Sequence, residues 1–199
     1  HDRTAPLREA FSAFPGVADA PVAHKVCYAR SVDGVTVVVL DTSMDRIETM
    51  QHEGELGDGQ LAWLDATLAA TTEPVLIAMH HPPFATGIGF MDEIGLTDRD
   101  AFAAVLAKHS HVMRIVCGHV HRVVMDVVSG VPAMIVPGVA HQVEMGLVPH
   151  APANMVMEPP AYGIHIVRDG RTTSHVGYVN DFGGPIEFND MAANAEPAR

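Results

Sequence analysis

The sequence predicts an α/β protein in which sheets pack face to face with helices on the outside. Three observations support this prediction. Short apolar runs alternate with amphipathic stretches in the middle of the chain, which is typical of strand–helix–strand units. Further along, paired apolar runs flank glycine-containing turns, as in hairpins. The length of 199 residues, with 48% hydrophobic and 18% charged residues, suits one globular domain.

The predicted elements follow one another with short connections. Leu61, Leu64 and Leu68 recur on one face of the first predicted helix. The prolines of HHPPF end the third strand, because proline cannot donate to a strand ladder. Thr97, with Asp100 three residues on, is the expected N-cap of the second helix. In order, the predicted ranges are strands 25–29 and 35–40, helix 58–70, strand 74–79, helix 97–109, and strands 112–117, 123–128, 133–136, 162–168 and 172–178.

Composition disfavours several classes of partner. The net charge is −12, from 24 acidic and 12 basic residues, which disfavours nonspecific binding to nucleic acid polymers or anionic lipid. No apolar run approaches the roughly 18 residues needed to cross a membrane. Cys27 and Cys117 lie in separate apolar runs and are expected to be reduced core thiols, which suits the cytoplasm.

The long apolar loop 137–160 is expected to form a cap or the interface of a homodimer or larger homo-oligomer.

Histidines gather where predicted strands end. The chain has 13 of them, and imidazole is the commonest metal ligand in proteins. Each predicted helix connects two consecutive strands, so the strand ends at 79 and 117 should lie on the same edge of a parallel sheet. Ligands bind at that edge in such sheets. The sequence therefore predicts a metal or catalytic site there, built from His80, His81, His119, His121 and His141.

The spacing of GHVH favours two metal ions over one. On an extended segment, His119 and His121 would point the same way, about 7 Å apart. Two ions about 3.5–4 Å apart can take one imidazole each. Gly118 would let the backbone turn sharply beside them. Such centres also use carboxylates, and the strand ends offer no obvious pair.

Taken together, HHPP and GHVH in this order resemble the calcineurin-like metallophosphoesterase superfamily. DGQLAWL, AMHHPPF, CGHVH and VPGVAHQV are similar to its cyclic-nucleotide and glycerophosphodiester phosphodiesterase branch. The resemblance implies an α/β/β/α sandwich of two mixed sheets flanked by helices, with the N-terminal strands absent from this chain. Residues 1–180 would then be the C-terminal part of a single domain and 181–199 a tail. The family's D-x-H motif, its bridging Asp and the Asn of G-N have no counterpart in the sequence, while the HD at residues 1–2 matches the second half of G-N-H-D.

The resemblance also implies roles for individual residues. His80 and His119 would bind the second metal, and His121 would bind the first. His1 would be the catalytic histidine, oriented by Asp2. His81 and His141 would face the substrate. Two divalent ions, drawn from Mn, Fe, Zn or Co, would activate a hydroxide that attacks phosphorus. The implied substrate is a small phosphodiester, either a 3′,5′-cyclic nucleotide or a glycerophosphodiester. A phosphomonoesterase and a noncatalytic scaffold with a degenerate metal site remain alternatives.

Overall fold

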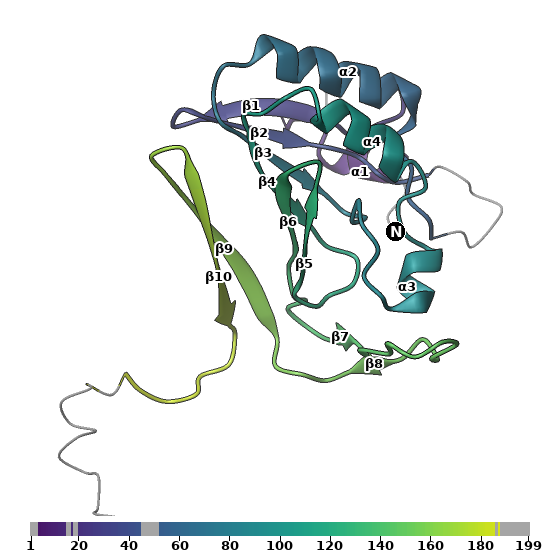
Figure 1. Ribbon diagram of the computed structural model, residues 1–199, viewed down its shortest axis with the longest axis vertical. Coiled ribbons are helices and arrows are strands. Elements are labelled where there is room, and N and C mark those ends of the chain that lie inside the picture. The colour runs from purple at the N-terminus through teal and green to yellow at the C-terminus, as the bar shows by residue number, and fades with distance from the viewer. Residues whose placement is uncertain (1–3, 15–16, 18–19, 45–51, 186, 188–199) are drawn as a thin grey trace, which may run out of the picture.

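The central element of the fold is a six-stranded mixed sheet, seen in a computed structural model that describes residues 4–14, 17, 20–44, 52–185 and 187 (Figure 1). Its strands are, in chain order, β1 (Tyr28–Val32), β2 (Val35–Val39), β3 (Val75–Met79), β4 (Val112–Cys117), β5 (Val124–Val128) and β6 (Val131–Ile135). Their spatial order is β1-β2-β3-β4-β6-β5. Strands β2, β3, β4 and β6 are parallel, whereas β1 and β5 pair antiparallel at the edges. The carboxyl ends of the four parallel strands therefore lie along one edge.

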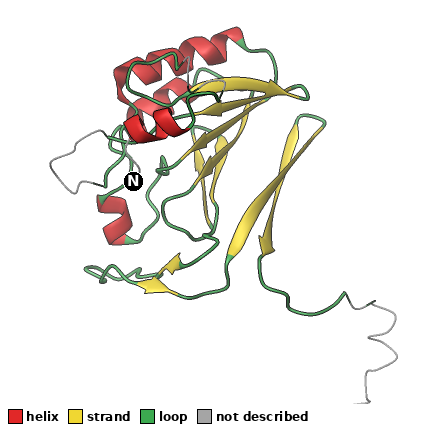
Figure 2. Cartoon of the chain, turned by 180° about the vertical axis from the view of Figure 1, so that it is seen from behind, coloured by secondary structure: helices red, strands yellow, loops and turns green. Residues whose placement is uncertain are grey.

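Two helices cover one face of this sheet, and the main core lies beneath them (Figures 1 and 2). These two helices are α2 (Gly57–Ala70) and α4 (Arg99–Leu106), and the described residues also form α1 (Thr4–Ala10) and α3 (Gly89–Glu93). Helix α2 connects β2 to β3, and α4 connects β3 to β4, as parallel pairing requires. Leu61, Leu64 and Leu68 of α2 are buried as their spacing predicted. They pack with side chains such as Ile77 and Ile115 from the sheet.

The N-terminus of α2 is capped from a distant part of the sequence. The Asp98 carboxylate accepts hydrogen bonds from the backbone N–H groups of Leu56, at 3.0 Å, and Gly57, at 2.8 Å. An acid at this position satisfies amides that have no partner within the helix and interacts favourably with the helix dipole.

The prediction that Thr97 caps the second predicted helix, α4, is wrong. The helix begins at Arg99, and the Thr97 hydroxyl donates to the Gly54 carbonyl at 3.0 Å.

A second layer lies on the opposite face of the sheet from α2 and α4 (Figures 1 and 2). It consists, in the described part of the chain, of the antiparallel ribbon β9 (Ala161–Arg168) and β10 (Arg171–Tyr178). Arg114 of β4 donates to the Thr172 carbonyl at 3.1 Å, and Gly163 approaches Val136 so closely that a Cβ would lie 2.6 Å from its side chain. The predicted α/β class and the mixed main sheet are confirmed.

The three predicted hairpins are all present, with small shifts. The first strand begins at Tyr28, three residues later than predicted. Lys25 and Val26, which precede it, donate hydrogen bonds to loop residues after β2 instead. All three turns consist of a residue with positive φ followed by a glycine, namely Asp33–Gly34, Ser129–Gly130 and Asp169–Gly170. Such pairs match the twist of antiparallel strands.

Four short elements were not predicted, namely helices α1 and α3 and strands β7 (Gln142–Val143) and β8 (Met155–Val156). Helix α3 forms where Asp92 accepts hydrogen bonds from the Thr86 N–H and hydroxyl, at 2.7 and 2.8 Å. The loop 137–160 contains β7 and β8 as a small ribbon. Within the described residues, no helix has the length and apolar character needed to cross a membrane.

The position of β4 at the centre of the sheet gives a stability prediction. Ile115 of β4 has no exposed surface, whereas Ile164 of β9 is 44% exposed. We expect Ile115→Ala to lower the free energy of unfolding by about 2–5 kcal/mol, because it leaves a cavity in the core. Urea denaturation measures this change, with Ile164→Ala as the matched control. Equal losses in the two variants would contradict the assignment of β4 to the core.

Candidate metal centre

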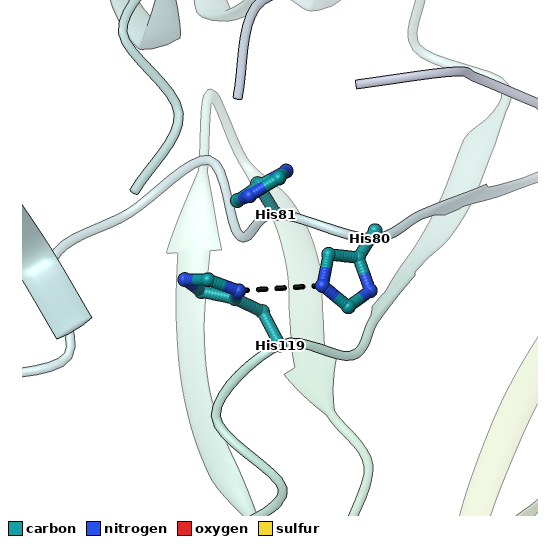
Figure 3. A group of neighbouring side chains, drawn as sticks. All are labelled: His80, His81 and His119. Carbon is teal, nitrogen blue, oxygen red and sulfur yellow. Dashed lines mark hydrogen bonds between the residues drawn. The ribbon is translucent and has the colours of Figure 1, made fainter. Parts of the chain in front are cut away.

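Parallel pairing of β3 with β4 brings His80 and His119 together. Met79 lies opposite Cys117, and the Gly118 N–H donates to the His80 carbonyl at 3.0 Å, extending the ladder past both strand ends. The rings then meet, with His119 Nδ1 lying 3.3 Å from His80 Nε2 (Figure 3). Nitrogens of His80, His81 and His119 all lie within 4.8 Å of one another. Three of the predicted histidines, His80, His81 and His119, therefore lie together at this edge of the sheet.

The GHVH segment is a tight turn and not an extended strand, so that part of the prediction is wrong. His119 and His121 have φ values of 71° and 55°, in the left-handed region, and the Val120 N–H donates to the Gly118 carbonyl at 2.9 Å. Non-glycine residues in this region cost on the order of 1–3 kcal/mol each and concentrate at functional sites. Gly118 lies close to the His80 ring, and a Cβ there would make a tight contact of 3.3 Å with His80 Nδ1.

His121 and His141 form a second group of histidines. Their ring centroids lie 4.7 Å apart, and both side chains are partly buried. His121 Nδ1 is buried and has no hydrogen-bond partner among the described residues. A buried nitrogen without a partner is costly, and a bound cation would satisfy it. The donor set thus fits metal binding at His121 as well as at His80 and His119.

Burial sets the protonation state of the histidine cluster. It lowers the pKa of His119 to about 3 and that of His80 to about 4, with neighbouring imidazoles adding to both effects. The His80 residue is exposed, but protein atoms surround its ring closely enough to disfavour a charge. Burial also lowers the pKa of His81. The three rings are therefore neutral near pH 7, the form that binds metal.

Both ring nitrogens of His81 make hydrogen bonds to the protein. Nδ1 lies 2.7 Å from the Thr42 hydroxyl, and Nε2 lies 2.9 Å from the His52 carbonyl. Thr42 follows β2, which is the strand end next to His80 and His81 in the sheet. The sequence interpretation missed Thr42 because it treated β2 only as half of a hairpin. The parallel pairing of β2 with β3 could have been inferred from the intervening helix.

Carboxylates contribute nothing to this cluster in the described part of the chain, where the candidate metal-binding group contains histidine alone. Asp41 also follows β2, but its carboxylate accepts from the N–H groups of Val26, at 2.7 Å, and Ser43, at 2.8 Å. It is thus engaged in local structure. His1 and Asp2, predicted to be catalytic and orienting, lie outside the described residues.

The lowered pKa values predict a loss of stability in acid. In the absence of metal, the unfolded chain should take up protons on His80 and His119 below about pH 6.5, while the folded chain resists until about pH 4 or lower. The free energy of unfolding should therefore fall as the pH drops from 6.5 towards 4. Urea denaturation across this range with chelator present measures the slope. His119→Gln should flatten it, and an unchanged slope would contradict the proposed burial effect.

Known proteins related to this chain act on phosphate esters. It is 32% identical over 157 residues to a probable glycerophosphodiester phosphodiesterase of Arcobacter nitrofigilis, an alignment covering 77% of this chain and 56% of that protein. It is 36% identical over 135 residues to a probable cyclic nucleotide phosphodiesterase of Rhodopseudomonas palustris, covering 66% and 47% of the two chains. No protein-family model matches the chain.

A solved structure shares the fold. A dimetal phosphatase from Danio rerio superposes with a TM-score of 0.52 at 20% identity, over 83% of this chain and 66% of that one. The chain spans about half the length of the curated relatives described above. On the combined evidence of sequence and fold, the chain belongs to the metallophosphoesterase superfamily, in the branch related to cyclic-nucleotide and glycerophosphodiester phosphodiesterases.

Proposed function

We propose that this protein hydrolyses small phosphodiesters, either 3′,5′-cyclic nucleotides or glycerophosphodiesters, with the help of two divalent metal ions. The observation that carries the proposal is the pair of neutral imidazoles of His80 and His119, 3.3 Å apart at two parallel strand ends. The names of the relatives support the substrate class, since one is a probable glycerophosphodiester phosphodiesterase and another a probable cyclic nucleotide phosphodiesterase.

The proposed division of labour follows the two groups of histidines. His80 and His119 would hold the second metal, and His121, with its buried Nδ1, would hold the first. Bound divalent ions neutralise the phosphate and generate hydroxide near neutral pH; Mn, Fe, Zn and Co all accept imidazole ligands. His141, whose ring packs against that of His121, would face the substrate, and His1 would supply the catalytic imidazole with Asp2 orienting it.

Loop 137–160 is anchored beside the proposed metal ligands. Arg122, directly after His121, donates to the Val143 carbonyl at 2.7 Å and forms an ion pair with Glu158 at 2.8 Å. The Arg122 side chain is only 15% exposed, so it fixes both arms of the loop to the site. We propose that this loop belongs to the single domain 1–180 and forms a wall of the substrate pocket.

Beyond its anchor, the loop exposes many apolar side chains. The most exposed are Val139, Met145, Leu147, Val148, Met155 and Met157, at 59–84% of their surface. Clustered apolar surface of this kind is typical of protein interfaces. We therefore propose that a second copy of the protein covers the loop.

The proposed compartment is the cytoplasm, where the buried free thiols of Cys27 and Cys117 stay reduced. Cell fractionation tests this proposal.

The catalytic proposal is tested with bis-p-nitrophenyl phosphate and p-nitrophenyl phosphate, using the full-length protein and added manganese. We expect diester turnover that chelator abolishes. His119→Ala should lower turnover by more than about 100-fold and reduce bound metal, since losing a ligand costs more than losing a supporting residue. His121→Ala should also reduce bound metal, because it removes a ligand of the other ion.

The exposed His175→Ala on β10 serves as the control and should retain both metal and turnover. Preference for the monoester would change the assignment to a phosphatase. Absence of turnover on both esters, together with absence of bound metal, would rule out the enzyme and leave the noncatalytic scaffold.

The interface proposal is tested by light scattering. Replacing Met155 and Met157 with serine should lower the mass of the assembly in solution, because it removes apolar surface that is 71% and 84% exposed. Met125→Ser, at a 69% exposed position on β5, is the matched control and should leave the mass unchanged. A monomeric parent protein would overturn the proposal.

A further inference from the structure

The hydrogen bonds of His81 determine which of its nitrogens carries the proton. The His52 carbonyl can only accept, so His81 Nε2, 2.9 Å away, must be the protonated nitrogen. Nδ1 then has a free lone pair and accepts from the Thr42 hydroxyl at 2.7 Å. The Thr42 oxygen in turn accepts the backbone N–H of His81 at 3.3 Å. Every hydrogen-bonding group of these two residues' side chains is thereby engaged.

Gly54 closes the space around His81 Nδ1. A Cβ at residue 54 would lie only 2.4 Å from Nδ1 and 2.5 Å from Cγ, so the backbone packs directly against this edge of the ring. Gly54 is itself fixed, because its N–H donates to the Gly95 carbonyl at 3.0 Å and its carbonyl accepts from the Thr97 N–H at 2.8 Å. His81 and Thr42 are 4% and 2% exposed. These contacts leave no room for an ion at Nδ1.

The His81 ring also packs against both proposed ligands of the second metal. Its centroid lies 4.8 Å from that of His80, with the planes nearly perpendicular at 87°, and 4.4 Å from that of His119 (Figure 3). A ring held at both nitrogens cannot rotate without breaking a hydrogen bond. It therefore restricts the orientations available to the two rings beside it.

We propose that His81 is a positioning residue, neither a metal ligand nor a substrate contact, that the His52 carbonyl fixes its tautomer, and that the Thr42 hydroxyl holds the ring in place at Nδ1. The proposal rests on the metal site of the proposed function and deepens it. It revises the expectation that His81 faces the substrate. In the opposite tautomer, Nε2 would carry a lone pair next to the His52 carbonyl, and two acceptors would face each other. The His52 carbonyl therefore excludes this tautomer, and the Thr42 hydroxyl, which can donate or accept, donates to the unprotonated Nδ1.

The first test uses nitrogen NMR of the full-length protein with labelled histidine, without metal and after addition of cadmium. We expect His81 to show an unprotonated Nδ1 and a protonated Nε2 in both states. Couplings to cadmium should appear for His80 and His119 and be absent for His81. A coupling to either nitrogen of His81, or a protonated Nδ1, would overturn the proposal. Hydrolysis is not measured, so failure here is distinct from failure of the catalytic proposal.

The second test compares Thr42→Val with Thr42→Ser. The valine variant keeps the shape but lacks the hydroxyl. We expect the chemical shift of His81 Nδ1 to move, because this nitrogen loses its hydrogen bond, and cadmium affinity to fall about 10–100-fold, as is typical when a residue supporting a metal ligand is lost. The serine variant should restore both. Thr36→Val is the matched control, because Thr36 is also buried in β2 and its hydroxyl donates to Glu73 at 2.7 Å, at the other end of the strand.

A wild-type Nδ1 chemical shift and wild-type affinity in Thr42→Val would overturn the proposal. Equal loss of affinity in Thr42→Val and Thr36→Val would also overturn it, because general destabilisation would then explain the effect. If Thr42→Val fails to fold, the serine variant and the couplings in the parent protein decide the matter.

Discussion

The arrangement of the site depends on the parallel register between β3 and β4. Met79 lies opposite Cys117, and the ladder continues into the bond from the Gly118 N–H to the His80 carbonyl. Side chains alternate between the faces of a strand, so a shift of one residue would turn one of the two histidines away from the other. Parallel pairing also requires a long crossover, which α4 supplies while covering the core.

The segment 52–57 joins this register to the rest of the molecule. At one end the His52 carbonyl holds His81, and at the other the N–H groups of Leu56 and Gly57 are capped by Asp98. Between them, Gly54 bonds to residues 95 and 97. The same short segment therefore begins helix α2 and packs against His81 of the histidine cluster. The stability of the helix and the geometry of the site are coupled for this reason.

Burying several imidazoles together is unfavourable unless they stay neutral or bind a cation. Burial lowers the pKa of His80, His81 and His119, and their mutual proximity lowers that of His80 and His119 further. The left-handed backbone at His119 and His121 adds conformational cost. Such an arrangement lowers the free energy of unfolding of the metal-free protein. Metal binding would raise it again, since ions that bind only the folded state stabilise that state.

The sequence by itself determined the longer elements from β1 onwards and their order. Apolar periodicity located helix α2 and strands β3 and β4, because a buried helical face repeats with the helical turn and a buried strand is a short apolar run. The motifs HHPP and GHVH located His80 and His119, because both follow directly on strands whose ends the topology brings together. Tertiary structure alone decided the contacts that local sequence does not encode. Asp98 caps a helix 41 residues away, and the Thr42 hydroxyl bonds to a histidine ring 39 residues away. The turn at His119 also escaped prediction, because non-glycine residues rarely adopt the left-handed backbone found there.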